Sequence, residues 1–338
     1  ITPGNTAFDF RKSKSAPCGA TGRKRNKMRK FAAILLAALM MVSAAACSTG
    51  SGTSSAADAA STADGASSEE TADNSEAEST TGDDSAAADD SWDKIVEKGE
   101  IVLGMDDAFP PMGYTDTTTG EIIGFDVDVA TEVFSRLGVE LKLQPIEWST
   151  KEMELDGGNV DLLWNGYSYT EERAEKQTLS DAYMKNNQVI LVKEDSSYQS
   201  LADLAGKSLG VQSDSSAESA LESEEATEFR ESLGEIVPID DYSKAILEIQ
   251  NGLIEAIAID EVVARFYLTN DPGAYRILEK EDGTVESLAV EDYVIGFRKG
   301  DQALCDKVNE TLKEMKADGT LAEISEKWFG EDVTTIEA

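Results

Sequence analysis

The 338-residue chain contains no histidine and three cysteines, Cys18, Cys47 and Cys305. Histidine is the commonest general base in enzymes and a frequent metal ligand, so its absence argues against a histidine-dependent hydrolase. None of the cysteines is spaced for a metal site, and no CxxC motif occurs. We therefore expect no zinc site, no other metal site and no cofactor.

Positive charge is also scarce in this chain. It carries 30 Lys and Arg against 66 Asp and Glu, which gives a formal net charge of −36 at pH 7. No basic surface could dominate such a molecule, and this argues against a nucleic-acid partner. The charge suits a solvated protein outside the cell.

The apolar run over residues 31–42 is too short to span a bilayer comfortably. It follows Arg29 and Lys30 and precedes three alanines and Cys47, which is the form of a secretory signal. A cysteine after small residues resembles the bacterial lipobox, whose cysteine receives a diacylglyceryl group, although Ala44 stands where leucine is more usual. We expect a lipoprotein signal peptide over 28–47, lipidation at Cys47 and anchoring on the extracytoplasmic face of the cell membrane. A plain signal cleaved nearby and an uncleaved anchor are the alternatives.

The segments on either side of this signal have no pattern typical of a fold. Residues 1–27 contain no targeting element, and we interpret them as an upstream extension that is not native. Residues 48–91 are rich in Ser, Thr, Ala, Gly, Asp and Glu and contain no Lys, Arg or aromatic residue. Such a composition buries too little apolar surface to offset the entropy of ordering, so we expect an acidic, disordered tether.

Residues 92–338 remain, which are too many for one small core and enough for two lobes. Short apolar segments alternate there with segments of helical periodicity, and this alternation predicts an α/β fold with open, mostly parallel sheets. The predicted strands are residues 101–105, 141–146, 160–164, 187–193, 208–212, 254–260 and 291–299. The predicted helices are residues 124–138, 215–223, 261–268, 304–319 and 320–330.

Ligands of open α/β sheets bind beyond the carboxyl ends of the strands. The polar and aromatic residues expected there are Asp106 with Phe109, residues 165–173, residues 212–216, and Asp260. This set combines a cation, a carboxylate, several hydroxyls and an aromatic ring. It is the complement of an α-amino acid, with the ligand carboxylate on Arg173 and the ligand ammonium on Asp260.

Arg173 stands where the local pattern does not favour a cation. Thr170 is a plausible helix N-cap, and Glu171 and Glu172 suit the positive end of a helix. A guanidinium that binds a ligand carboxylate through two hydrogen bonds would explain the exception. A surface arginine paired with Glu172 or Glu175 would explain it equally well, and the local pattern leaves both interpretations open.

Other signals in the same regions have two interpretations each. The segment SSAE at residues 215–218 fits a capping box, and the helix start could offer backbone N–H groups to an anion or be no more than well capped. Phe109 precedes two prolines, which favours a loop aromatic over a core one. Trp148 could line the pocket or pack beneath it. Asp126 and Asp128 are interpreted as solvated acids at a helix start.

Four separated blocks resemble a known family. The blocks are FPPMGYTDTTTGEIIGFDVDVATEVFSRLG, LDGGNVDLLWNGYSYTEERAEKQTLSDAYM, LADLAGKSLGVQSDSSAESAL and LKEMKADGTLAEISEKWFG. In this order, over residues 92–330, they resemble the family 3 solute-binding proteins, the amino-acid receptors of ABC importers. The resemblance implies a two-lobed periplasmic-binding-protein-like fold of type II, with two hinge strands and a ligand cleft between the lobes. Lobe one would comprise residues 92–186 and 291–338, and lobe two residues 187–290.

The resemblance also implies how the amino-acid backbone of a ligand is held. Arg173 would bind the α-carboxylate with help from Ser168. Ser216 would add a second contact to that carboxylate from lobe two. Asp260 would bind the α-ammonium, with the carbonyl of Gly166 as its helper.

A further set of matching positions would recognise the ligand side chain. Phe109 and Trp148 match positions that sandwich it, and Asp106 and Gln212 match positions that read its polar end. One departure stands out, because Asp214 occupies a place where relatives often have glycine. A carboxylate there would weaken an anion site unless it turned outward, and it would favour a cationic side chain.

These inferences predict an extracytoplasmic lipoprotein, expected to be a monomer, that captures a polar amino acid by lobe closure. It would deliver the amino acid to an ABC permease driven by its ATPase, without covalent chemistry. One alternative is a dehydratase acting on cyclohexadienyl acids, with Asp106 or Glu147 as the general acid. Another is a sensing module for a receptor kinase, which would need a partner protein.

Overall fold

The computed structural model describes residues 89–338, and all of these belong to one unit by their contacts. The expected upstream extension, the signal segment with Cys47, and the expected tether up to residue 88 lie outside the described residues. Helix α1 (Ser91–Lys98) opens the described fold and ends at Gly99, whose left-handed backbone closes the helix.

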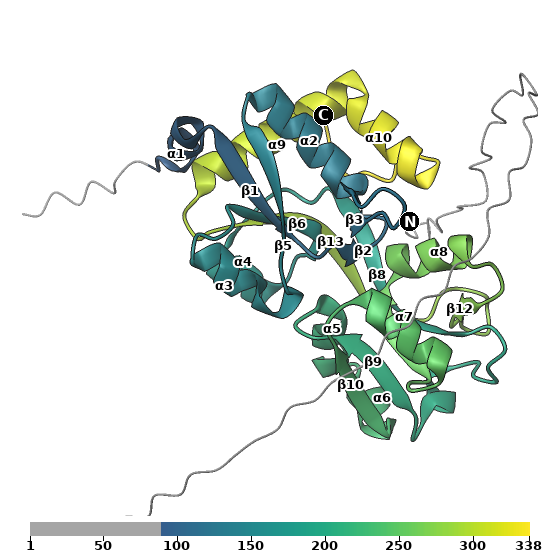
Figure 1. Cartoon of the computed structure of the whole chain (residues 1–338). Coiled ribbons are helices and arrows are strands. Elements are labelled where there is room, and N and C mark those ends of the chain that lie inside the picture. The colour runs from purple at the N-terminus through teal and green to yellow at the C-terminus, as the bar shows by residue number, and fades with distance from the viewer. Residues whose placement is uncertain (1–88) are drawn as a thin grey trace, which may run out of the picture. The chain divides into compact units, whose positions relative to one another are not determined.

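A ten-stranded sheet organises the described residues (Figure 1). Its strand order is β10-β9-β11-β8-β13-β6-β1-β5, with β12 paired to β8 and β7 paired to β13. The strands are β1 (Glu100–Met105), β5 (Glu140–Pro145), β6 (Leu162–Ser168), β7 (Thr178–Leu179), β8 (Met184–Lys193), β9 (Ser208–Gln212), β10 (Glu235–Ile239), β11 (Ala256–Asp260), β12 (Tyr275–Ile277) and β13 (Ser287–Phe297). A second, three-stranded sheet contains β2 (Ala108–Phe109), β3 (Gly113–Thr115) and β4 (Ile122–Ile123).

The main sheet divides into two lobes. In lobe one, β1 pairs in parallel with β5 and with β6. In lobe two, β9 pairs in parallel with β10 and with β11. The predicted parallel pairing is therefore confirmed within each lobe. Between them run β8 and β13, which pair antiparallel with each other and join the two halves of the sheet (Figure 1).

Helices cover the sheet in each lobe (Figure 1). Lobe one carries α1, α2 (Phe125–Leu137), α3 (Lys151–Asp156), α4 (Glu171–Lys176), α9 (Gln302–Asp318) and α10 (Thr320–Phe329). Lobe two carries α5 (Ser216–Glu222), α6 (Thr227–Ser232), α7 (Tyr242–Asn251) and α8 (Glu261–Asn270). Short 3-10 helices, η2 (Trp148–Thr150) and η3 (Leu201–Leu204), complete the set. The C-terminal helices return to lobe one, where α9 packs on α1 and α10 packs on α2.

Local sequence explains where several helices begin and end. The predicted caps are confirmed at α4 and α5, where the side chains of Thr170 and Ser215 accept backbone N–H bonds from the first helical turn. Asp241 caps α7 in the same way. Gly138 ends α2 with a left-handed backbone, as predicted from its position after the periodic residues.

The hydrophobic core lies on both faces of the sheet. Every residue of β6 and of β11 is buried, which is typical of central strands covered by helices. The largest apolar cluster contains residues of both lobes, and two smaller clusters fill the opposite face, one in each lobe. Within residues 89–338, no helix is both long enough and apolar enough to span a bilayer.

Candidate ligand-binding cleft

Polar residues from the ends of three strands and the start of one helix meet where the two lobes face each other. The amide of Gln212, which ends β9, donates to Oδ2 of Asp106, which follows β1, at 2.7 Å. The hydroxyl oxygens of Ser168, at the end of β6, and Ser216, at the start of α5, are 3.1 Å apart. These contacts join lobe one to lobe two, so the structure brings together four of the residues that the sequence selected.

Asp260 ends β11 and is 3% exposed. Its Oδ1 accepts hydrogen bonds from Asn186 Nδ2 at 2.7 Å, Gln188 Nε2 at 2.9 Å and the Tyr293 hydroxyl at 2.7 Å. Its Oδ2 accepts one from the Tyr242 hydroxyl at 3.2 Å. Burial is the main cause that raises the pKa of Asp260, to about 7, while the hydrogen bonds from Tyr293, Gln188 and Tyr242 oppose the rise.

A second carboxylate, that of Glu291, raises the pKa of Asp260 further. Glu291 belongs to β13 and is half-buried. Its Oε2 accepts hydrogen bonds from Ser168 Oγ at 2.8 Å, Gln188 Nε2 at 2.9 Å, and Asn186 Nδ2 and Ser216 Oγ at 3.3 Å each. Glu291, Asn186 and Gln188 were not predicted from the sequence. Residues 185–188 at the start of β8 are all polar, and the strand alternation that puts Asn186 and Gln188 on one face was a signal that could have found the two amides.

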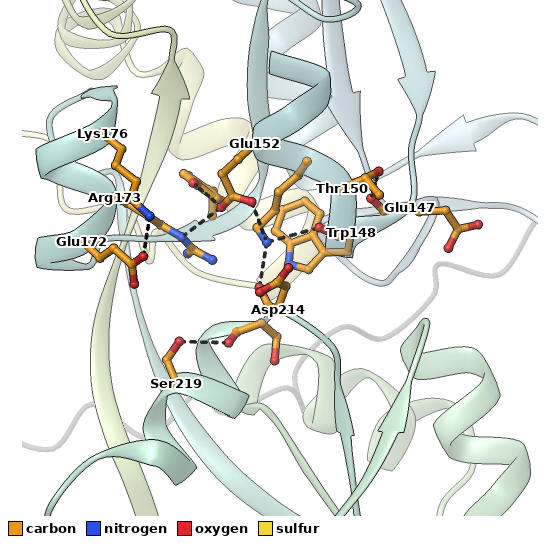
Figure 2. A network of polar contacts seen from close by, with 12 residues as sticks. Glu147, Trp148, Thr150, Glu152, Glu172, Arg173, Lys176, Asp214 and Ser219 are labelled. Atoms are coloured by element: carbon orange, nitrogen blue, oxygen red, sulfur yellow. Dashed lines mark hydrogen bonds and ion pairs between the residues drawn. The ribbon is translucent and has the colours of Figure 1, made fainter. Parts of the chain in front are cut away.

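Arg173 is held inward by its own lobe. It is 9% exposed, its guanidinium lies 4.2 Å above the Tyr167 ring, and Nη1 donates to the Ser168 carbonyl at 2.7 Å. Its nearest acid is Glu152, at 3.8 Å. The surface-arginine alternative is therefore wrong, because Glu172 pairs with Lys176 rather than with Arg173 (Figure 2).

A polar cavity of about 370 Å³ lies beside this guanidinium, lined from lobe one by α3 and α4 and from lobe two by Asp214 and Ser219. Lys151 links the two sides of the cavity, because its Nζ donates to the Asp214 carbonyl of lobe two at 2.7 Å and to the Trp148 carbonyl of lobe one at 3.2 Å. The Lys151 side chain is 1% exposed, and burial lowers its pKa. Lys151 is thus a direct polar link between the lobes.

Asp214 has the left-handed backbone that glycine adopts most readily, with φ of 57°. This conformation accounts physically for the glycine expected in relatives. The expected capping box is only half formed. Ser215 accepts from the backbone of Glu218, but the Glu218 side chain reaches the amide of Asp214 instead of that of Ser215. Ser216 follows as the first residue of α5.

The residues expected to contact a ligand side chain fall into two places. Phe109 is 5% exposed and packs against Tyr242 of lobe two, with ring centroids 5.6 Å apart. Trp148 is 7% exposed and packs edge-on against Tyr167 at 6.0 Å. The two predicted sandwich residues belong to different hydrophobic clusters. Near Phe109, Asp106 is buried, and this burial raises its pKa to about 6.

Gly166 allows the rings around the cleft to come close. Its φ is +58°, and a Cβ there would lie 2.7 Å from Phe109 Cε1 and 3.1 Å from Tyr293 Cζ. Its amide donates to Oδ2 of Asp126 at 2.7 Å. The expectation that Asp126 is solvated is wrong, because it is fully buried and its pKa is raised by that burial to about 7. The buried Asp126 carboxylate therefore holds the Gly166 backbone in place beside the cleft.

Two α/β lobes, joined by two strands and lined at their junction by hydroxyls, carboxylates and a guanidinium, define the class of two-lobed solute-binding proteins. Within residues 89–338, no group of three or more Cys, Asp and Glu side chains is arranged to hold a metal ion. Comparison with known proteins identifies the family.

The family model described as "Bacterial extracellular solute-binding proteins, family 3" matches residues 101–331. The chain is 31% identical over 246 residues to the L-cystine-binding protein TcyA of Bacillus subtilis (strain 168), which covers 72% of this chain and 87% of that protein. It is 30% identical over 233 residues to the arginine-binding extracellular protein ArtP of the same organism, covering 69% and 87%. A structure of an ABC uptake transporter substrate-binding protein from Streptococcus pneumoniae with bound histidine has a TM-score of 0.68 and 38% identity, over 73% of this chain and 99% of that one.

This chain belongs to family 3 of the bacterial extracellular solute-binding proteins. The family and the two-lobed fold expected from the four sequence blocks are confirmed. The relatives named here are binding proteins and not enzymes.

Proposed function

We propose that this protein captures a polar amino acid between its lobes and delivers it to the permease of an ABC importer. The observation that carries the proposal is the linked network at the lobe junction. Arg173 reaches Ser168, Ser168 meets Ser216 of lobe two, and Gln188 connects Ser216 to Asp260. The Arg173 guanidinium and the buried Asp260 carboxylate are thereby connected by one hydrogen-bond network. This suits a zwitterion, which carries both a carboxylate and an ammonium.

In this proposal, Arg173 and the hydroxyls of Ser168 and Ser216 bind the α-carboxylate, and Asp260 binds the α-ammonium with the Gly166 carbonyl as helper. Charge-assisted hydrogen bonds in a site shielded from water are the strong ones. Phe109 and Trp148 enclose the ligand side chain. Because these groups come from both lobes, the ligand favours the closed arrangement over the open one.

The polar end of the ligand side chain is read by Asp106 and Gln212 in this proposal. A buried carboxylate on this side favours a cationic or polar side chain. The relatives support that class, since one is named as a cystine-binding protein, another as an arginine-binding protein, and a third was solved with histidine.

The proposal also includes the location of the protein. A diacylglyceryl group on Cys47 would anchor the chain on the extracytoplasmic face of the membrane, and the acidic segment that follows it, up to residue 88, would tether the two lobes near the permease. Two acyl chains give durable anchoring, at about 0.8 kcal/mol for each buried CH₂. The protein acts as a monomer and performs no catalysis.

A thermal-shift screen of amino acids on the purified protein tests the ligand class. A true ligand at 100 times its dissociation constant adds about 2.7 kcal/mol to the free energy of unfolding. Calorimetry on Arg173→Ala and Asp260→Asn then tests the site, and both variants are expected to lose binding. Undiminished binding by both variants, or no stabilisation of the wild type by any amino acid, contradicts the proposal.

A further inference from the structure

Glu291 lies at the centre of the proposed site, although it comes from a strand that joins the lobes. Three residues proposed to bind the ligand surround it. Ser168 of lobe one and Ser216 of lobe two donate to its Oε2, and the Asp260 carboxylate is near enough to respond to its charge. A side chain in this position touches both lobes when they are together.

The carboxylates of Glu291 and Asp260 are bridged by two buried amides. Nε2 of Gln188 lies 2.9 Å from an oxygen of each carboxylate. Nδ2 of Asn186 lies 2.7 Å from Asp260 and 3.3 Å from Glu291. Both amides stand on β8, which pairs on one side with β13, where Glu291 lies opposite Asn186, and on the other with β11, where Asp260 lies opposite Gln188.

Each carboxylate keeps an oxygen with spare capacity to accept hydrogen bonds. Within residues 89–338, all hydrogen bonds to Glu291 go to Oε2, which leaves Oε1 without a donor. In the described part of the chain, Oδ2 of Asp260 accepts a hydrogen bond from Tyr242 alone. Among the described residues, the buried oxygens Gln188 Oε1 and Asn186 Oδ1 also have no hydrogen-bond partner. Buried acceptors without donors are costly, and a ligand group rich in N–H donors would satisfy them.

We propose that Glu291 is a second ammonium-binding carboxylate, which forms with Asp260 a two-acid receptor for the cationic nitrogen of the ligand. This inference rests on the proposed function and adds a specificity-determining residue to it. An ammonium has three donors, and two carboxylates in neighbouring positions accept them at separate oxygens. The pair therefore selects a zwitterion over a carboxylic acid that lacks the amine.

A rival geometry places the Glu291 carboxylate in competition with the ligand. Its Oε2 accepts from Ser168 and Ser216, the hydroxyls proposed to bind the ligand carboxylate. If Glu291 occupied that place, removing its charge would strengthen binding. The shared amides favour the ammonium instead, because Gln188 and Asn186 tie Glu291 to Asp260.

Protons and the ligand ammonium compete for Asp260, so the proposed two-acid receptor predicts a ligand affinity that depends on pH. The titratable groups that face Asp260 are Glu291 and Tyr293 from β13 and Tyr242 from α7, while β8 contributes only amides. Burial and the Glu291 charge both favour a proton on Asp260. A bound ammonium displaces that proton, so the affinity falls as pH drops below about 7.

The experiment compares the wild type with Glu291→Gln by calorimetry from pH 5.5 to pH 8.5. The probes are L-arginine, L-cystine, L-glutamine and L-histidine, and the one that binds the wild type most tightly is carried forward. At pH 8.5, above the raised pKa of Asp260, Glu291→Gln is expected to bind about tenfold more weakly or worse, because one attractive charge is lost. As the pH is lowered, the affinity of Glu291→Gln is expected to start falling at a lower pH than that of the wild type, because the Glu291 charge no longer raises the pKa of Asp260.

Asp292→Asn is the matched control, because it removes one charge from the next residue of the same strand, where Asp292 pairs with Lys185 on the surface. It is expected to leave affinity unchanged. If Glu291→Gln loses binding entirely, Glu291→Asp serves as a second variant. It keeps the carboxylate charge and is expected to retain measurable binding. Unchanged or tighter binding by Glu291→Gln at pH 8.5 overturns the inference while leaving the proposed function intact. Failure of all four probes to bind the wild type overturns the proposed function for these ligands, and this inference with it.

Discussion

Lys151 offers a direct test of whether closure of the lobes stabilises the bound state. Its ammonium donates to the Asp214 carbonyl across the lobe junction at 2.7 Å, and its other contacts, to Trp148 and Glu152, lie within lobe one. Lys151→Met keeps most of the side-chain volume and removes the donors. Opening the lobes breaks the contact with Asp214 and leaves the other two in place.

The magnitude follows from the kind of hydrogen bond that is lost. A bond from a charged donor contributes about 1.5–3 kcal/mol net. Burial lowers the pKa of Lys151, which shows that part of the gain is offset by desolvation, so we take about 1.5 kcal/mol. This corresponds to about a tenfold weaker affinity, because about 1.4 kcal/mol changes an equilibrium constant tenfold.

Stopped-flow kinetics with the bound amino acid separates closure from encounter. A contact made only after closure slows dissociation, so Lys151→Met is expected to raise the dissociation rate about tenfold and to leave the association rate nearly unchanged. Lys98→Met is the control, because Lys98 pairs with Asp161 inside lobe one at 2.9 Å. Equal dissociation rates for wild type and Lys151→Met would refute the reasoning, and a slower association would assign Lys151 to ligand encounter instead.

Two further predictions concern the buried support of the cleft. Burial raises the pKa of Asp126 to about 7, so the folded state holds a proton that the unfolded chain releases near its ordinary pKa of 3.8. The stability that this group contributes is therefore present at low pH and is lost as pH rises through about 7. Asp126→Asn should flatten that part of the pH dependence in thermal melts. An unaltered profile in Asp126→Asn would assign the slope to other groups. Gly166→Ala places a Cβ 2.7 Å from Phe109 at a φ of +58°, and we expect denaturant titration to show a loss of about 1–3 kcal/mol in unfolding free energy. Gly120→Ala is the control, because Gly120 also has a left-handed backbone but a Cβ there meets no atom within 4 Å. It should show only the cost of the backbone conformation.

Sequence patterns predicted the elements that depend on neighbours along the chain. Hydroxyl and carboxylate caps, apolar periodicity and terminal glycines act over a few residues, and for this reason the starts of α4 and α5 and the end of α2 could be read directly. Strand β10 was missed because Pro238 interrupts its apolar pattern and its first residue is exposed. The strands that were predicted are mostly central ones, in which continuous apolar runs leave little ambiguity.

The support of the cleft depends on contacts that no local pattern contains. Asp126 has the position of a solvated helix-start acid at the beginning of α2, but it is buried, and its carboxylate accepts the amide of the left-handed Gly166 in β6. Glu291 stands in a segment that predicts only a strand. Whether its side chain meets the ligand depends on the antiparallel register of β13 against β8, which sets Glu291 opposite Asn186. That register is a tertiary property of the fold.

The same register connects recognition to motion. Of the four donors to Asp260, two come from β8 and one from β13, so the strands that join the lobes also position the acid proposed to bind the ammonium. The fourth comes from α7 of lobe two, which contacts Phe109 of lobe one through the same ring. A change in the angle between the lobes must therefore shift the donors around Asp260 relative to one another. An amino acid that needs those donors in one arrangement selects one lobe angle, and ligand affinity and closure then become a single equilibrium.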